Sequence, residues 1–502
     1  MTQTPARASR AEGMAATDFL QTERQEKRAR VILSLLVFLP CLVMVLALDN
    51  DLWFLLNSGR YVLENGIPTI EPFTLHQNFR FLMQQWLSAV LYWCVYSRLG
   101  AAGVLALLFA VYCATVAVLY KLARYLSQGN AIAAFLAALL ASAALKLTVT
   151  SRPIVFTLLV LSVELYLLER FTGTAKPRYL LALPALSALL INLHAAMWPI
   201  QFVLLLPYMI DAFRFRFWIF RGQGYPKRYF FPAVALMFAA GFLNPYGWSA
   251  MSYLFRSYGY QEIGIVLEMQ PPNINHITGM MIFGFIFLVA AIYLLKKNRE
   301  TRLRYALLTL GTIVLTLSSI RSFSIFALCA MFPLAYLLKD VSLPKGKIHT
   351  GKGILRLRAV LIAAVVVTVS GLLSQRVSAF VRADQTPAVA QAVHYLKENE
   401  PQEDMVLYTG YNEGGFAEYM GLKPYIDPRA EVFVKKNNGA KDVMLEYYRL
   451  QVGQEYYKSV LDEYGFTHLI VSQDDILSAD LPHDDDYTCV YDDGEYAVYR
   501  HR

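Results

Sequence analysis

Long apolar runs alternate with short polar segments over the first three quarters of the chain. Eleven of these runs approach the roughly 20 residues that a helix needs to cross about 30 Å of hydrocarbon. They fall at 31–48, 100–120, 131–149, 153–169, 179–193, 195–213, 229–243, 277–295, 305–320, 322–338 and 357–377. The pattern predicts an α-helical polytopic membrane protein, with about 11 transmembrane helices in residues 31–380.

Residues 381–502 follow a different pattern, in which short helical and strand periodicities alternate. Helices are expected at 387–397, 441–450 and 455–464, and strands at 405–408, 467–471, 487–491 and 495–499. A stretch of this length is sufficient to bury a core of its own. The sequence therefore predicts a small C-terminal α/β domain.

Two apolar segments in residues 49–99 differ from the predicted spans. Leu52 to Asn65 has an amphipathic helical pattern that ends at Gly66, and Phe81 to Leu99 is interrupted by Gln84, Gln85 and Arg98. Both patterns are typical of helices that lie along a membrane surface. We expect 49–99 to form a first outer loop with two interfacial helices.

The distribution of Lys and Arg predicts the orientation. Residues 1–30 form a tail that ends in basic residues, and further basic clusters occupy 121–124, 170–178, 214–228, 296–304 and 339–358. The intervening segment 244–276 carries only Arg256. Because basic loops stay in the cytoplasm, we expect a cytoplasmic N-terminus and an extracytoplasmic C-terminal domain. Asp49 follows the first span directly, without a small-residue cleavage site, so we expect this span to stay uncleaved.

Composition supports the membrane assignment. Of the 502 residues, 56% are hydrophobic and 17% are charged, against about 25% charged in soluble proteins. This excludes a soluble enzyme, a disordered chain and a disulfide-rich secreted module. Five scattered cysteines suggest neither a disulfide framework nor a metal site.

The formal net charge of +8 combines two opposite contributions. From Asp384 onward the chain has 23 acidic and 10 basic residues, so the preceding residues carry a net charge of +21. The basic excess is explained by cytoplasmic loops, so we expect no nucleic-acid partner.

Two carboxylates, Asp49 and Asp51, directly follow the first span. At the outer membrane edge, such a pair can deprotonate a substrate hydroxyl, hold a sugar or coordinate a divalent cation such as Mg or Mn. The alternative is a solvated helix end. Trp53, Gln85 and Trp86 follow in the same loop, as sugar-binding residues or as anchors at the lipid headgroups.

Further polar residues lie at predicted outer ends of spans or in outer loops. They are Arg152, Asn192, His194, Asn244, Tyr246, Glu268 and Arg321. Each alone is explained by a cap, a turn or an anchor, but the predicted topology places all of them on the same face as Asp51. Arg152 and Arg321 are suitable ligands for a phosphate.

His194 is a candidate acid, base or hydrogen-bond donor. In the C-terminal domain, Asp427 and Arg429 are candidate ligand-binding residues, or a local ion pair.

The order of these motifs resembles that of bacterial multi-pass membrane proteins of the C-type glycosyltransferase (GT-C) superfamily, in particular a group with a C-terminal extracytoplasmic α/β domain. The matching stretches are Asp49-Asn50-Asp51-Leu52-Trp53, Gly59-Arg60, Gly66-Ile67-Pro68, Glu71-Pro72-Phe73-Thr74, Gln85-Trp86-Leu87, Ser151-Arg152-Pro153, Asn192-Leu193-His194, Leu243-Asn244-Pro245-Tyr246-Gly247, Arg321, Gly414-Gly415 and Ile426-Asp427-Pro428-Arg429.

The resemblance implies a polyprenyl phosphate-linked sugar donor that is used on the outer face, with a first-loop carboxylate as base or metal ligand. The chain departs from the family pattern at two positions. Glu71 replaces an expected Asp, and Gln85 replaces an expected His or Glu. Gln85 cannot act as a general base, so it can substitute only if this position binds sugar.

The leading hypothesis is a membrane glycosyltransferase with Asp51, assisted by Asp49, as its catalytic carboxylate. The acceptor is expected to be a polysaccharide, lipid or protein of the cell envelope, and membrane lipid contacts the spans. The alternatives are a transporter or flippase of a lipid-linked or anionic substrate, and a catalytically inactive GT-C-like scaffold in cell-envelope assembly.

Overall fold

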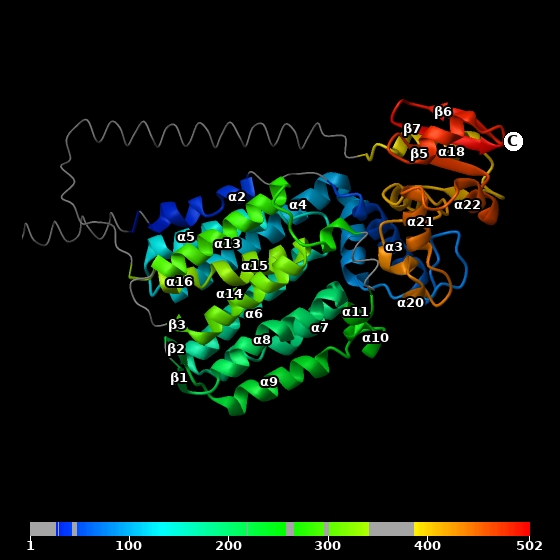
Figure 1. Cartoon of the computed structure of the whole chain (residues 1–502). Helices are drawn as coiled ribbons and strands as arrows, with labels where there is room; N and C mark the ends of the chain where they lie inside the picture. Colours follow the sequence, from blue (N-terminus) through cyan, green and yellow to red (C-terminus); the bar gives the residue numbers. More distant parts are fainter. Residues whose placement is uncertain are drawn as a thin grey trace, which may run out of the picture.

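The computed structural model describes residues 27–28, 30–42, 48–217, 219–257, 266–295, 301–340 and 386–502. The predicted span at 357–377 lies outside these residues, as do most of the N-terminal tail and part of the first predicted span. Figure 1 shows the apolar helices lying alongside one another as a bundle, with the C-terminal elements at one end.

The bundle is built from the apolar runs of the sequence. Its helices are α2 (Leu39–Leu42), α4 (Trp86–Leu126), α5 (Ala131–Leu145), α6 (Ile154–Thr174), α7 (Leu183–Leu193), α8 (Trp198–Asp211), α9 (Lys227–Ala240), α13 (Ile277–Leu295), α14 (Leu303–Ser318), α15 (Phe323–Met331) and α16 (Leu334–Leu337). Among the described residues, three segments are long and apolar enough to cross a membrane, namely Trp86–Leu126, Ile277–Leu295 and Ile320–Leu337. The predicted count of about 11 spans is not confirmed.

Interruptions inside the apolar runs explain the shorter helices. The predicted run at 131–149 forms a helix only as far as Leu145. Pro333 separates α15 from α16, because proline lacks the N–H that a helix interior needs. Helix α6 has 21 residues, but it carries Glu164, Glu169 and Arg170 and is therefore less apolar.

Helix α4 changes direction at Gly100, whose backbone has φ 61° and ψ −159°. This conformation is accessible mainly to glycine. Trp86–Leu99 is thereby separated from the apolar segment that follows, at the boundary that the sequence predicts. The angle of Trp86–Leu99 to the membrane surface stays a prediction.

Helix α3 (Asp51–Asn65) coincides with the predicted amphipathic helix and ends at Gly66, whose N–H donates to Val62 O. Its first half is buried against protein instead of lying open on a surface. A Cβ at Gly59 would lie 2.1 Å from Ala89 O, so α3 and α4 are in close backbone contact. This part of the interfacial-helix prediction is corrected, because α4 and the C-terminal residues enclose α3.

The C-terminal elements form a four-stranded sheet flanked by short helices. The strands are β4 (Leu407–Tyr408), β5 (His468–Ser472), β6 (Tyr487–Asp492) and β7 (Tyr496–His501), and the helices are α18 (Ala390–Asn399), α19 (Gly414–Tyr419), α20 (Lys435–Asn438), α21 (Val443–Gln451), α22 (Tyr457–Tyr464) and α23 (Leu477–Asp480). The strand order is β4-β5-β7-β6, with β4 and β5 parallel and the other pairs antiparallel. The helices and strands expected here are present, with ends within three residues of those predicted.

A second, small sheet lies at the opposite end of the bundle from α3 (Figure 1). It has the order β1-β2-β3 and consists of β1 (Phe215–Phe217), β2 (Phe220–Gly222) and β3 (Thr301–Arg302). The short helices α10 (Trp248–Met251) and α11 (Tyr253–Arg256) lie at the α3 end. The basic segments around β1 to β3 are therefore far from the C-terminal elements. Which end faces the cytoplasm stays a prediction.

Within the described residues, six short 3-10 helices connect these elements. They are η1 (Pro177–Tyr179), η2 (Ala195–Met197), η3 (Leu267–Met269), η4 (Ile320–Ser322), η5 (Ala430–Phe433) and η6 (Leu481–His483). Two of them, η3 and η4, carry residues of the candidate site.

Candidate functional site

The Asp-Asn-Asp motif forms the N-terminal end of α3. Asp49 Oδ1 accepts the backbone N–H of Asp51 at 3.0 Å, and the N–H of Asp49 donates to Ser151 Oγ at 2.7 Å. Negative charge is favourable at this end of a helix because the helix dipole is positive there. The motif is thus held against the segment that precedes α6.

Arg152 joins three carboxylates at this position. Its Nε lies 3.1 Å from Asp49 Oδ1 and 3.0 Å from Asp51 Oδ2, and its Nη1 lies 2.9 Å from Glu268 Oε1. We call these four residues the Arg152 cluster. The side chain of Arg152 is 28% exposed and that of Glu268 is 48% exposed, so the cluster is open to a ligand.

The Arg152 cluster contains more carboxylates than cations, and this affects Asp51. Burial raises the pKa of Asp51 to about 7, the charges of Asp49 and Glu268 act in the same direction, and those of Arg152 and Arg321 oppose the rise. A base is most effective when its pKa lies near the working pH. Asp51 therefore has the protonation behaviour of a general base at neutral pH.

Arg321 adds a second cation beside the Arg152 cluster. Arg321 lies on η4 and is exposed. Two hydrogen bonds connect the η4 segment to the turn that carries Glu268. Ser319 Oγ donates to Glu268 O at 3.1 Å, and the N–H of Ile320 donates to Gln270 O at 3.0 Å. The predicted convergence of Asp51, Arg152, Glu268 and Arg321 is thus present in the structure.

His194 lies in the turn between α7 and η2 and is 4% exposed. Its Nδ1 is 2.9 Å from Thr157 Oγ1. Burial lowers the pKa of His194 to about 3, and the charge of Arg321 acts in the same direction. The imidazole is therefore neutral at physiological pH, which favours hydrogen bonding to Thr157 over the acid role.

Asp49 and Asp51 are also the candidate ligands for a divalent cation. In the Arg152 cluster, however, the guanidinium lies between the carboxylates and supplies the positive charge that a metal would bring. Within the part of the chain that the structure describes, no group of three or more His, Cys, Asp or Glu side chains is arranged to hold a metal ion. The side chains present do not fit a metal centre.

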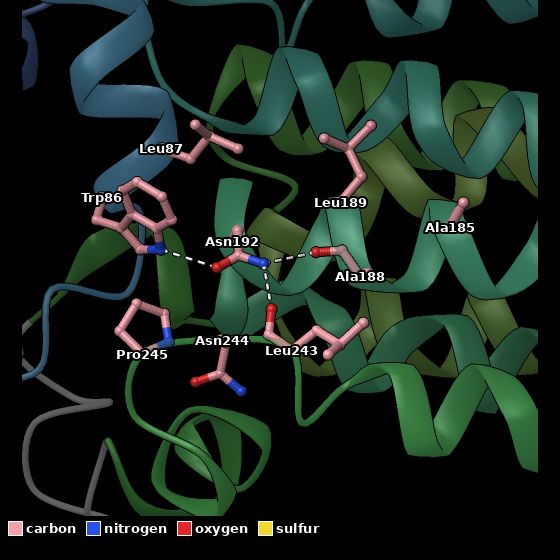
Figure 2. Close-up of a pocket in the computed structure, with 9 residues that line it drawn as sticks. All are labelled: Trp86, Leu87, Ala185, Ala188, Leu189, Asn192, Leu243, Asn244 and Pro245. Carbon is pink, nitrogen blue, oxygen red and sulfur yellow. Dashed lines mark hydrogen bonds between the residues drawn. The ribbon is translucent and has the colours of Figure 1, made fainter.

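Trp86 and Asn192 line a shallow groove of about 750 Å³ (Figure 2). Their polar atoms are occupied by protein: Trp86 Nε1 donates to Asn192 Oδ1 at 3.0 Å, and Asn192 Nδ2 donates to Ala188 O and Leu243 O. The groove therefore presents a largely apolar surface. Sugar binding by Trp86 and Asn192 stays a prediction.

Asn244 and Tyr246 have structural roles. The Asn244 side chain donates to Gly241 O at 2.6 Å and accepts the N–H of Tyr246 at 2.8 Å, which stabilises the turn. Tyr246 Oη donates to Pro68 O at 2.9 Å and accepts the N–H of Met83 at 3.1 Å. Asn244 thus stabilises its own turn, and Tyr246 holds the first loop against this turn.

Gln85 precedes α4, is half-buried and makes no side-chain cap hydrogen bond there. Its neighbour Gln84 contacts two other parts of the chain: Nε2 donates to Glu431 Oε1 at 3.2 Å, and Oε1 accepts the N–H of Ala196 at 3.3 Å. The amide of Gln84 thus connects the first loop to the η2 segment and to Glu431.

Trp53 is a packing residue, because it is only 5% exposed. Its ring contacts Phe416 edge-on at 4.9 Å and Tyr419 at 5.1 Å between centroids. The interface-anchor and sugar-binding expectations for Trp53 are both corrected, since α19 covers the indole.

Arg429 lies in a second group of three carboxylates, together with Glu71, Glu418 and Asp427. Its Nη2 is 2.9 Å from Glu71 Oε1 and 3.0 Å from Glu418 Oε2, and its Nε is 2.9 Å from Asp427 Oδ1. We call these residues the Arg429 cluster. Arg429 is 3% exposed, so the structure favours the ion-pair interpretation of Asp427 and Arg429 over the ligand-binding one.

Glu71 also serves the first loop. Its carboxylate accepts the N–H groups of Phe73 at 3.0 Å and Thr74 at 2.9 Å. The replacement of an expected Asp by Glu71 therefore concerns a structural position. Sequence reasoning missed the partnership of Glu71 with Arg429 and Glu418, because no local pattern links residues so far apart in the chain.

A third buried group was also missed. Arg304 pairs with Glu169 at 2.7 Å and with Asp211, and all three side chains are fully buried. Their positions in or beside apolar runs are the signal that was available in the sequence, since charges at membrane depth require partners. The charge pattern alone assigned Arg304 to a basic loop.

Solved structures of glycosyltransferases have the same overall arrangement. The oligosaccharyltransferase AglB from Archaeoglobus fulgidus, in complex with an inhibitory peptide and a dolichol-phosphate, is 10% identical with a TM-score of 0.55 over 89% of this chain and 70% of that chain. ArnT from Cupriavidus metallidurans in the apo state is 15% identical with a TM-score of 0.52 over 97% and 98% of the two chains. No protein-family model and no curated protein sequence matches the chain. The chain therefore has a fold similar to that of GT-C glycosyltransferases, as its motif order predicts.

Proposed function

We propose that the chain is a membrane glycosyltransferase that moves a sugar from a polyprenyl phosphate-linked donor to an acceptor on the outer face of the membrane. The observation that carries the proposal is the Arg152 cluster, where a carboxylate with a pKa near 7 lies beside two arginines. The fold is shared with AglB, which was solved with a dolichol-phosphate. Fold alone does not define a reaction, so the site carries the argument.

In this proposal Asp51 accepts the proton of the acceptor hydroxyl as that oxygen attacks the anomeric carbon of the donor sugar. The bond from this carbon to the phosphate oxygen breaks, and the phosphate leaves with the electron pair and the attached polyprenyl chain. Attack opposite the leaving group inverts the anomeric centre. Asp51 is thus the catalytic base, and Asp49 holds it through the first turn of α3.

The two arginines have different roles in this mechanism. Arg152 already neutralises three carboxylates, so it chiefly orients Asp51. Arg321 is exposed and its charge reaches Asp51, so it stabilises the negative charge that develops on the leaving phosphate. The sequence alone predicted that Arg152 and Arg321 both bind phosphate.

The groove beside Trp86 suits the lipid part of the donor. Ala185, Ala188, Leu189 and Leu243 line it, and the two leucines are exposed (Figure 2). An apolar chain loses contact with water when it enters such a groove. The proposed acceptor is a polysaccharide, lipid or protein of the cell envelope.

The test is turnover of polyprenyl phosphate sugars by the full chain in lipid nanodiscs. We expect release of polyprenyl phosphate from at least one donor, and loss of this release in Asp51→Asn and Arg321→Ala. Glu64→Gln and Arg98→Ala are matched controls, because both residues are exposed and lie outside the Arg152 cluster. Donor turnover that survives both site substitutions would disprove the site, and transport without turnover would favour a flippase.

A further inference from the structure

The C-terminal elements contain a cleft that the proposed transfer reaction does not use. It has a volume of about 360 Å³ and lies where α21 ends, between the start of α22 and α23. Such a volume falls at the small end of the range of about 300–1,000 Å³ that is usual for ligand sites. We call it the Tyr456 cleft, after the exposed aromatic residue at its edge.

Tyr456 is the most exposed large hydrophobic side chain of the described C-terminal elements, and it lines this cleft. Within residues 386–502, the large hydrophobic side chains that are strongly exposed are Tyr448, Val452 and Tyr456, at 37%, 46% and 64%. Tyr456 lines the cleft together with Tyr457, and their ring centroids are 5.3 Å apart at an interplanar angle of 61°. An aromatic surface that is left open in a water-exposed unit indicates a binding surface.

The cleft also carries hydrogen-bonding groups without protein partners. Gln454, Glu455 and Asp480 line it and are exposed. None of the side-chain hydrogen bonds or ion pairs among the described residues involves these three side chains. Two carboxylates and one amide beside tyrosine rings can accept and donate hydrogen bonds to the hydroxyl groups of a sugar, while its C–H face packs on a ring.

The walls of the cleft are held in place before any ligand binds. Gln451 Nε2 donates to Asp475 Oδ2 at 3.0 Å, which connects the end of α21 to the segment before α23. Tyr457 Oη donates to Asp484 Oδ2 at 2.8 Å. The turn between α21 and α22 requires a positive φ of 70° at Gly453. A preformed cleft of this kind binds its ligand at a lower entropic cost.

We infer that the Tyr456 cleft binds a carbohydrate chain of neutral or amino sugars. The negative charge of the surroundings favours this class of ligand. The chain from Asp384 onward has 23 acidic and 10 basic residues. Within the cleft itself, Glu455 and Asp480 repel an anionic sugar. The inference concerns a site that is separate from the Arg152 cluster, and it goes beyond the transfer reaction.

The binding test uses the full chain in nanodiscs made of glycerophospholipids without sugar headgroups, and no sugar-based detergent. The probes are tetrasaccharides of N-acetylglucosamine, of glucose and of glucosamine, with an oligogalacturonate as the acidic probe, in saturation-transfer NMR and titration calorimetry. We expect binding of a neutral or amino tetrasaccharide and none of the oligogalacturonate. Failure of every neutral and amino probe, or binding of the acidic probe alone, would overturn the inference.

Substitutions locate the binding. Tyr456→Ala is expected to weaken the affinity about tenfold or more, which corresponds to about 1.4 kcal/mol or more. Tyr448→Ala is the matched control, because this tyrosine is exposed on α21 but does not line the cleft. Equal losses in both variants, or no loss in Tyr456→Ala, would contradict the inference.

The same Tyr456→Ala variant separates this proposal from the proposed transfer. Its turnover of donor with a small monosaccharide acceptor is expected to equal that of the original chain, since the Arg152 cluster is unchanged. If the chain binds tetrasaccharide at Tyr456 but turns over no donor, carbohydrate binding is supported and the proposed transfer is disproved. If it turns over donor but binds no tetrasaccharide, the transfer is supported and carbohydrate binding at the cleft is disproved.

Discussion

The Arg152 cluster and the Arg429 cluster contain the same chemical groups, one guanidinium and three carboxylates, but they differ in exposure. The Arg152 side chain is 28% exposed, whereas that of Arg429 is 3% exposed. The first cluster joins Asp49 and Asp51, at the start of α3, to Arg152 before α6 and to Glu268 on η3. The second joins the first loop to the C-terminal elements.

The excess negative charge has different consequences in the two clusters. In the Arg429 cluster, burial raises the pKa of Glu418 well above its ordinary value, and Asp427 and Glu71 add to the rise. The group is enclosed, so its ionisation state affects stability only. In the Arg152 cluster the pKa of Asp51 is about 7 and the carboxylates are open to a ligand. The two clusters have the same composition, so exposure is the property that makes the Arg152 cluster the candidate site and the Arg429 cluster a structural group.

The largest expected effect is on folding, from Arg429→Met. Removal of the guanidinium leaves buried carboxylates without a counter-charge, a change that usually costs about 3–5 kcal/mol. We expect a markedly lower melting temperature, measured by intrinsic fluorescence in nanodiscs. Arg449→Met, at an exposed arginine of α21, is the control. Equal melting temperatures for the two variants would show that the Arg429 cluster does not stabilise the fold.

The next effect is on catalysis alone, from Asp51→Asn. Loss of a positioned base usually lowers a rate by about 10²–10⁴-fold, and we expect a loss of this order in donor turnover. The melting temperature should fall much less than in Arg429→Met, because the side chain of Asp51 is 19% exposed and that of Arg429 is 3% exposed. A fall in melting temperature as large as that of Arg429→Met would show that the Arg152 cluster stabilises the fold in the same way as the Arg429 cluster.

A smaller effect concerns the pH dependence of turnover. Since Asp51 acts when deprotonated, turnover should rise with pH through about 7. Arg152→Gln removes a charge that lowers the pKa of Asp51, so the rise should move to higher pH by roughly 1 unit or more. Glu268→Gln removes a charge that raises this pKa, so the rise should move to lower pH, by less because Glu268 is half exposed.

The measurement is kcat/KM against pH for the three proteins with one donor. Shifts in opposite directions are the expected signature of electrostatic coupling to Asp51. Shifts in the same direction, or a rise that persists in Asp51→Asn, would assign the titration to another group.

The smallest expected effect is that of chelation. Because the Arg152 guanidinium lies between Asp49 and Asp51, we expect turnover in excess EDTA to match turnover in added Mg or Mn. The control is a metal-dependent glycosyltransferase in the same buffer. Loss of turnover in EDTA that is restored by metal would show that the carboxylates bind a cation in place of Arg152.

Local patterns predicted many elements of this chain. The amphipathic pattern from Leu52 to Gly66 predicted α3, because a helix repeat and a terminal glycine are local properties. The charge pattern predicted that Asp51, Arg152 and Arg321 share one face, since hydropathy and Lys/Arg bias constrain which span ends lie together. The alternating patterns after Asp384 predicted the strands and helices of the C-terminal elements.

Other predictions depend on packing, which the sequence does not show. Trp53 and Trp86 have the same amphipathic side chain, but α19 covers Trp53, and Trp86 donates its N–H to Asn192. Asn192 and Asn244 were expected to bind substrate, yet both complete backbone hydrogen bonds. The predicted number of spans is not confirmed among the described residues, because hydropathy does not show where a helix ends inside an apolar run.

The sequence by itself determined which part of the chain is apolar and which is polar, the helical and strand periodicities, and the positions of acidic and basic residues. These are properties of the linear chain. Only the tertiary structure decided that Arg429 meets Glu71 across 358 positions and that Arg152 collects three carboxylates. It also decided that the Arg429 cluster is buried and the Arg152 cluster is partly exposed. The exposure of a charge depends on which distant elements cover it, and this exposure separates the candidate base Asp51 from the buried carboxylates around Arg429.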